Sequence, residues 1–156
     1  MSCLENRFDF VLPLVAVVVL VTVSHTQAAP RRLGGRCEYA DYAGTATILK
    51  IEKTEASKKQ AEVVGGAGYE GYEVWFSFET KEKIKHELAR HAVKKRHEFR
   101  LCNSWYVGPE YIEKYGIKKD KKFECTLKVI TKGTCSPVVF KFDKLDDTDY
   151  FESKKR

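Results

Sequence analysis

The sequence predicts a mainly β domain with one or two helices, arranged as a small five-stranded barrel and preceded by a signal peptide. Three observations carry this prediction. Several short segments alternate between apolar and polar residues, as half-buried strands do. Four cysteines follow an apolar N-terminal run, which is typical of small exported domains. The clearest strand covers residues 72–79, where one face holds Tyr72, Val74, Phe76 and Phe78.

Residues 1–28 are interpreted as a cleavable secretory signal peptide. A polar start precedes an apolar run over residues 10–23, and the small residues Thr26 and Ala28 predict cleavage after Ala28. The alternative is an uncleaved membrane anchor, although the run of 14 residues is shorter than the roughly 20 that a bilayer span needs. The prediction is therefore a periplasmic or extracellular protein with no transmembrane span after cleavage.

Cleavage leaves 128 residues, which is enough for one domain. The predicted plan is an extended lead-in over 29–41, a barrel domain over 42–142 and a frayed, charged tail over 143–156. The whole chain has 28 basic and 22 acidic side chains, and removing one basic and two acidic residues leaves 27 and 20, a net charge of +7. This excess suits an anionic partner, or it serves solubility alone.

Along the domain, alternation and β-branched residues predict five strands, at residues 42–53, 72–79, 98–102, 123–130 and 137–142. Residues 53–71 hold charged residues followed by a glycine cluster at 65–68, which predicts a flexible turn in a hairpin loop. Thr80 is suited to cap a helix over 81–95. Pro109 and Gly116 are suited to begin and end a second, short helix over 109–115.

A short helix between the third and fourth of five strands resembles the OB-fold, a partly open Greek-key barrel. The resemblance is one of architecture and covers residues 42–142. It implies a binding module with a groove and exposed side chains on its middle strands, and it implies no catalytic residues. A different small open sheet with a packed helix is the alternative.

The four cysteines that remain after cleavage form an even set, which predicts two disulfides with three alternative connectivities. They are Cys37, Cys102, Cys125 and Cys135. None of them forms a CxxC pair, which argues against a zinc knuckle and against a thioredoxin-type redox site.

The sequence predicts no enzyme, metal site or cofactor. His86 and His91 resemble a zinc-protease pair but are five residues apart, so on one helix they would point about 140° away from each other. If all four cysteines pair, none is left as a nucleophile. A metal-dependent enzyme that uses the two histidines is the least favoured hypothesis.

Aromatic and cationic residues on exposed strand faces and in one turn predict a binding surface, because rings stack on bases or sugars while cations pair with anionic groups. The residues are Trp75, Arg100, Trp105, Tyr106 and Lys128. The alternative for both tryptophans is packing in a second small core. The favoured hypothesis is an exported module that binds an unknown protein, a glycan or another anionic polymer. A nucleic-acid-binding OB domain is the second hypothesis.

Overall fold

The computed structural model describes residues 36–153, which belong to one compact unit. The predicted signal peptide, residues 1–28, lies outside the described residues, and so does most of the predicted lead-in. Among the described residues, no helix is long and apolar enough to cross a membrane.

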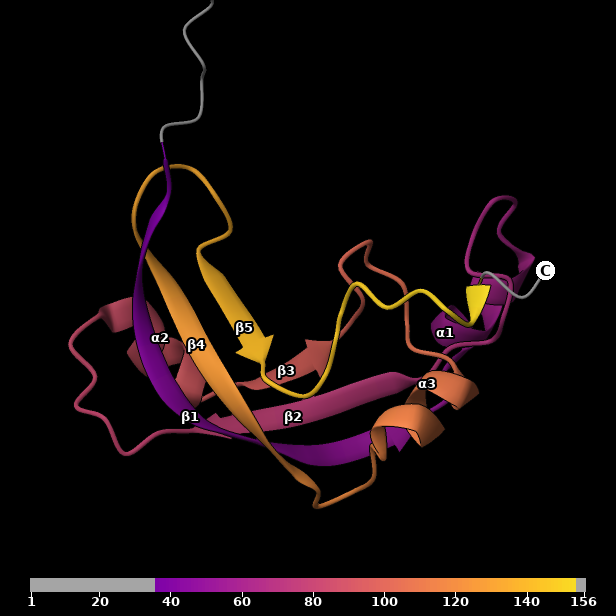
Figure 1. The fold of residues 1–156 in the computed structure, drawn as a ribbon, viewed down its shortest axis with the longest axis horizontal. Helices are drawn as coiled ribbons and strands as arrows, with labels where there is room; N and C mark the ends of the chain where they lie inside the picture. Colours follow the sequence, from indigo (N-terminus) through magenta and orange to yellow (C-terminus); the bar gives the residue numbers. More distant parts are fainter. Residues whose placement is uncertain (1–35, 154–156) are drawn as a thin grey trace, which may run out of the picture. The chain divides into compact units, whose positions relative to one another are not determined.

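Five antiparallel strands form one curled sheet in the order β3-β2-β1-β4-β5 (Figure 1). The mainly β prediction is therefore confirmed, with β1 central and with β3 and β5 at the two edges. The strands are β1 Glu38–Glu52, β2 Glu73–Glu79, β3 Arg96–Phe99, β4 Lys122–Lys132 and β5 Val138–Phe142.

The curl of the sheet originates in β1, which is 15 residues long and begins four residues before the predicted start. Its first part pairs with β4 from Glu38 to Thr47, and its second part pairs with β2 from Thr45 to Glu52. Gly44 lies where the strand passes from one neighbour to the other. A Cβ at this position would clash with the Phe78 ring and with the backbone of β2, so glycine permits the close approach.

The concave face of the sheet carries the core. The alternation predicted for β2 and β4 is confirmed, since Val74, Phe76 and Phe78 are buried on one strand, as are Phe123, Cys125, Leu127 and Val129 on the other. Side chains also join the two edges, because the rings of His97 on β3 and Phe140 on β5 are 4.3 Å apart. No backbone ladder joins these two strands within residues 36–153, so the sheet is a half-barrel.

Three α-helices accompany the sheet, namely α1 Glu55–Lys59, α2 Glu87–Val93 and α3 Pro109–Tyr115, and a short 3₁₀ helix covers Gln60–Glu62. Helices α2 and α3 lie at opposite ends of the sheet (Figure 1). Helix α3 has the predicted bounds, with proline in its first turn and Gly116 in the left-handed conformation at its end. Helix α1 lies before the predicted glycine turn, in a segment for which no helix was predicted, and it begins where Thr54 and Ser57 form a capping box. The turn predicted at residues 65–68 is present.

The helix predicted over residues 81–95 is wrong in its first half. Helix α2 begins only at Glu87 because other contacts hold the preceding segment to β1. The Thr80 hydroxyl donates to the backbone oxygen of Ala43 at 2.6 Å, and the Ala43 N–H donates to the Glu82 carboxylate at 2.7 Å. These two side chains therefore hydrogen-bond the backbone of Ala43, in a part of β1 that does not pair with β2.

The third strand is also displaced from its prediction. Strand β3 ends at Phe99, and residues 100–104 turn away from the sheet. Leu101 accepts a backbone hydrogen bond from Ser104, which has a φ of 69°, so the chain reverses there. Leu101 is nevertheless buried, as its place in the apolar alternation predicts.

The prediction of a frayed tail is wrong for residues 143–153, which fold over α3. Leu145 is buried, and the Tyr111 hydroxyl donates to the Asp146 carbonyl at 2.9 Å. The Glu152 carboxylate accepts the Tyr111 N–H at 3.1 Å, so the tail supplies a cap that α3 lacks in its own sequence. The charged composition of the tail gave no indication of these contacts in the sequence.

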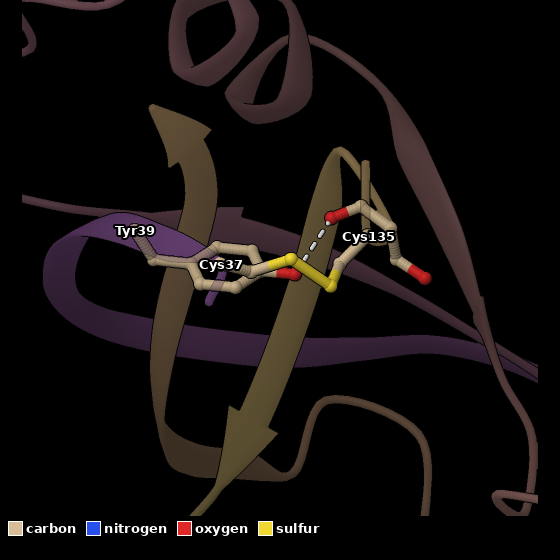
Figure 2. The surroundings of a disulfide bond; sticks show 4 residues. Cys37, Tyr39 and Cys135 are labelled. Carbon is tan, nitrogen blue, oxygen red and sulfur yellow. Dashed lines mark hydrogen bonds between the residues drawn. A yellow bond between two sulfur atoms is a disulfide. The ribbon is translucent and has the colours of Figure 1, made fainter. Parts of the chain in front are cut away.

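The structure forms one disulfide, Cys37–Cys135, and not the two that were predicted. Figure 2 shows this bridge joining the start of β1 to the β4–β5 turn, beside a hydrogen bond of 3.0 Å from the Tyr39 hydroxyl to the Ser136 carbonyl. In the same turn Gly133 has a φ of 102°, and a Cβ there would lie 2.8 Å from the Cys37 sulfur. Cys102 and Cys125 are unpaired.

Taken together, the five curled antiparallel strands and the short helix between β3 and β4 are consistent with the OB-like architecture that the sequence predicts.

Candidate functional site

Two of the predicted binding residues form a close pair. The Arg100 guanidinium lies 3.9 Å from the centre of the Tyr106 ring, and its Nε donates to Glu98 at 2.9 Å. Burial opposes the charge of Arg100, but its hydrogen bonds and charge interactions with Glu98 and Tyr106 together outweigh this effect and raise the pKa of the guanidinium. One face of the Tyr106 ring is therefore already covered by a cation from the same domain.

The other three predicted residues lie apart and have partners of their own. Trp105 is partly buried, and its ring packs edge-on against Tyr150 at 6.0 Å. The Trp75 indole donates to Glu73 at 3.1 Å on the convex face of β2. Lys128 forms an ion pair of 2.6 Å with Asp41 on the neighbouring strand.

The predicted surface is therefore not assembled as a single stacking platform. Stacking on bases requires free aromatic faces in a shared groove, and these rings contact neighbouring side chains instead. Trp75 does line a shallow pocket of 290 Å³ with Lys50 and Arg96, but the carboxylates of Glu52 and Glu73 line the same pocket.

A different feature stands out, a cationic segment formed by residues 81–97. It holds seven lysines and arginines, three histidines and only two acids, a net charge of +5 without the histidines. By contrast, residues 36–153 together have 22 basic and 20 acidic side chains, since six basic and two acidic residues of the 28 and 22 lie outside them. The cationic segment therefore carries more net charge than the whole described domain, for which the net value is +2.

The cations of this segment lack acidic partners. Among the described residues, no carboxylate lies within 4 Å of any of the seven, which are Lys81, Lys83, Lys85, Arg90, Lys94, Lys95 and Arg96. Elsewhere in the described domain, seven of the other fifteen lysines and arginines form ion pairs. The two acids of the segment are already engaged, Glu82 with the Ala43 N–H and Glu87 with His91.

The fold holds the cationic segment in a defined place. The backbone N–H groups of Lys85 and His86 both donate to the Tyr42 hydroxyl at 3.3 Å. Ala89 and Ala92 bury one side of α2 in the core, which leaves Arg90 and His91 exposed on the other side. The cations therefore project from an anchored element.

Beside this segment lies a groove of 420 Å³ between α2 and the two edge strands. Leu88, which is 42% exposed, and Lys95 line it from the helical side, while Val138 and Phe140 line it from β5. His97 contributes from β3, and its Nε2 lies 2.8 Å from the Ala92 carbonyl. The groove is apolar at its base, and its rim carries Lys95 and His91 together with Glu98, whose carboxylate is bound by Arg100.

The two histidines of the metalloenzyme hypothesis do not share a site. The His86 ring lies edge-on to Tyr42 at 6.4 Å, before α2 begins, whereas the His91 imidazole faces Glu87 at 3.5 Å. Within residues 36–153, no group of three histidine, cysteine, aspartate or glutamate side chains is arranged to hold a metal ion.

The two unpaired cysteines differ in environment. Cys102 is exposed in the turn after β3, whereas Cys125 is buried in the inner face of β4. Burial, with a smaller contribution from Asp143, raises the pKa of the Cys125 thiol to about 12. Because the thiolate is the reactive form, Cys125 is inert in the folded protein.

Among the cysteines of residues 36–153, we expect a maleimide to label only Cys102 in the native protein at pH 8. Raising the pH to 9 leaves Cys125 protonated, so only denaturant should expose a second reactive thiol. Mass spectrometry of the labelled peptides measures both rates, and a folded Cys102→Ser variant should stay unlabelled within residues 36–153. Equal labelling rates for the two thiols would contradict the buried position of Cys125.

No family model, no curated protein and no solved structure matches this chain.

Proposed function

We propose that the chain is an exported, non-catalytic binding module whose cationic segment, residues 81–97, holds an anionic partner. The observation that carries the proposal is the set of seven exposed cations without a carboxylate partner among the described residues. Concentrating like charge on a surface disfavours the compact state, whereas an anionic partner gains affinity and association rate from it.

Two further observations support the proposal. The Cys37–Cys135 disulfide fits a protein that works in an oxidising compartment. The curled five-stranded sheet resembles OB-like modules, which bind ligands on the sheet face and in the adjoining loops. The predicted signal peptide, residues 1–28, supplies the export route, and mass spectrometry of the native protein tests whether it is removed.

The partner class is distinguished by three anionic probes, polyglutamate, heparin and single-stranded oligo-dT. We expect polyglutamate to bind with an affinity that falls steeply with salt, because Debye screening weakens exposed charge contacts. Preferential binding of oligo-dT with quenching of tryptophan fluorescence would instead favour the nucleic-acid hypothesis.

A charge variant locates the site. Changing Lys83, Lys94 and Lys95 together to glutamine is expected to weaken polyglutamate binding about tenfold, since each exposed ion pair contributes about 0.2–1 kcal/mol. The matched control changes Lys118, Lys119 and Lys122 to glutamine, which removes the same charge from the turn before β4 and from the first residue of that strand. An equal loss in both variants would show that net charge, and not the cationic segment, governs binding.

A further inference from the structure

The outer edge of β5 exposes backbone groups that no strand satisfies in the described domain. Two backbone bonds bracket its pairing with β4, from Ile130 to the Pro137 carbonyl at 3.0 Å and from Asp143 to the Glu124 carbonyl at 3.1 Å. Hydrogen-bonded pairs alternate along an antiparallel ladder. The N–H and C=O groups of Val138 and Phe140 therefore point away from β4, toward the open seam.

This edge is regular. The β4–β5 register contains no bulge, and the bridge Cys37–Cys135 with the Tyr39–Ser136 hydrogen bond fixes the turn from which β5 starts (Figure 2). Natural proteins commonly disrupt a free edge with a bulge or cover it, because a regular edge pairs with other chains. A rigid edge also lowers the ordering cost of binding.

The groove beside the edge has the chemistry to receive alternate side chains of an added strand. Its base is apolar, with the partly exposed Phe140 and Val138 facing Leu88 across the 420 Å³ space. Its rim carries Lys95, which has no carboxylate within 4 Å among the described residues, and His91, which faces Glu87. Glu98 also lines the groove, and its carboxylate is bound by Arg100. Apolar side chains fit the base, and acidic side chains complement the rim.

We propose that β5 binds an extended acidic polypeptide segment by strand addition, with apolar side chains in the groove and carboxylates against the cationic segment. In this recognition mode the main chain supplies hydrogen bonds and the pockets select alternate side chains. A glycan or a nucleic acid has no peptide backbone that could form a ladder of hydrogen bonds with this edge. The inference rests on the proposed function, because the cationic segment supplies the charge selection.

The test uses the full chain and a labelled ten-residue peptide that alternates glutamate with valine. Val138→Pro removes an outward N–H and leaves the β4 ladder intact, and proline is tolerated at such edge positions. Val138→Ala is the matched control, since it shortens the side chain and keeps the N–H. We expect the proline variant to bind the peptide at least tenfold more weakly and the alanine variant to bind within about threefold of wild type.

Peptide N-methylation gives an independent readout that does not alter the protein. Methyl groups on one set of alternate residues should abolish binding, and methyl groups on the other set should leave it unchanged, because only one set faces β5. Equal binding by both methylated peptides, or by both Val138 variants, would overturn strand addition. If the lysine variants still weaken polyglutamate binding in that case, the proposed function stands and only strand addition is overturned. If no anionic probe binds, both proposals fail.

Discussion

Replacing Phe76 by alanine is expected to lower the free energy of unfolding by about 3–5 kcal/mol, the cost typical of a buried phenylalanine. The side chain is 1% exposed, and its ring centre lies 5.2 Å from those of both Phe140 and Phe142. It therefore joins the middle of the sheet to the β5 edge. The cavity would remain lined by the two phenylalanine rings of β5, which limits relaxation. Urea unfolding followed by circular dichroism measures the change.

The matched control is Val139→Ala on the convex face of β5, where the side chain is 37% exposed. Its expected cost is below about 1 kcal/mol, the range of surface substitutions away from packed features. A similar loss of stability in the two variants would mean that the concave face is not the principal core. It would also remove the physical basis for the curled sheet.

Removing the disulfide with Cys37→Ser and Cys135→Ser is expected to lower the free energy of unfolding by about 2–4 kcal/mol. The bridge closes a loop with a sequence separation of 98 residues, so the unfolded chain gains much freedom when it is cut. The native state also loses the link that fixes the β4–β5 turn to β1. Urea unfolding of the double variant, compared with wild type with and without reductant, measures the effect.

Cys102→Ser is the control for this experiment, because Cys102 is an exposed thiol with no disulfide partner. It should unfold as wild type does, and reductant should not change its difference from wild type. Should reductant leave the stability of the wild-type protein unaltered, the Cys37–Cys135 bridge would not be the stabilising link described above.

The parts of the fold that were predicted correctly are those with a strong local signal. Strands β2 and β4 alternate over seven and eleven residues, and one face of each is buried, so the period of two identifies them directly. Helix α3 has proline at its start and glycine at its end, and its bounds follow from these two residues.

The parts that were predicted wrongly depend on contacts between distant residues. The first half of the predicted 81–95 helix is held by Tyr42 and Ala43, which lie about 40 positions earlier. The tail is ordered by Tyr111, Tyr115 and Lys114, more than 30 positions before it. The pKa of the Asp149 carboxyl reflects these contacts. Burial alone would raise this pKa, but the hydrogen bonds from Lys114 and Tyr115, with the charge of Lys114, lower it by more.

The candidate site shows the same division. Composition identified the basic excess, and residue type identified Arg100 and Tyr106, which do contact each other. The cationic segment was missed because acids are interleaved with its lysines. Only the structure shows that Glu82 and Glu87 have other partners. A count of charge in 17-residue windows would have identified residues 81–97 from the sequence.

The position of the disulfide also determines how the domain would carry mechanical load. Cys37 precedes β1 and Cys135 follows β4, so four of the five strands lie within one covalent ring. Tension applied between the two ends of the chain would pass through the sulfur–sulfur bond directly to β5. The covalent path of the force would then bypass β1 to β4 while the bridge is intact, and β5 would be the first strand to peel away from its neighbour β4.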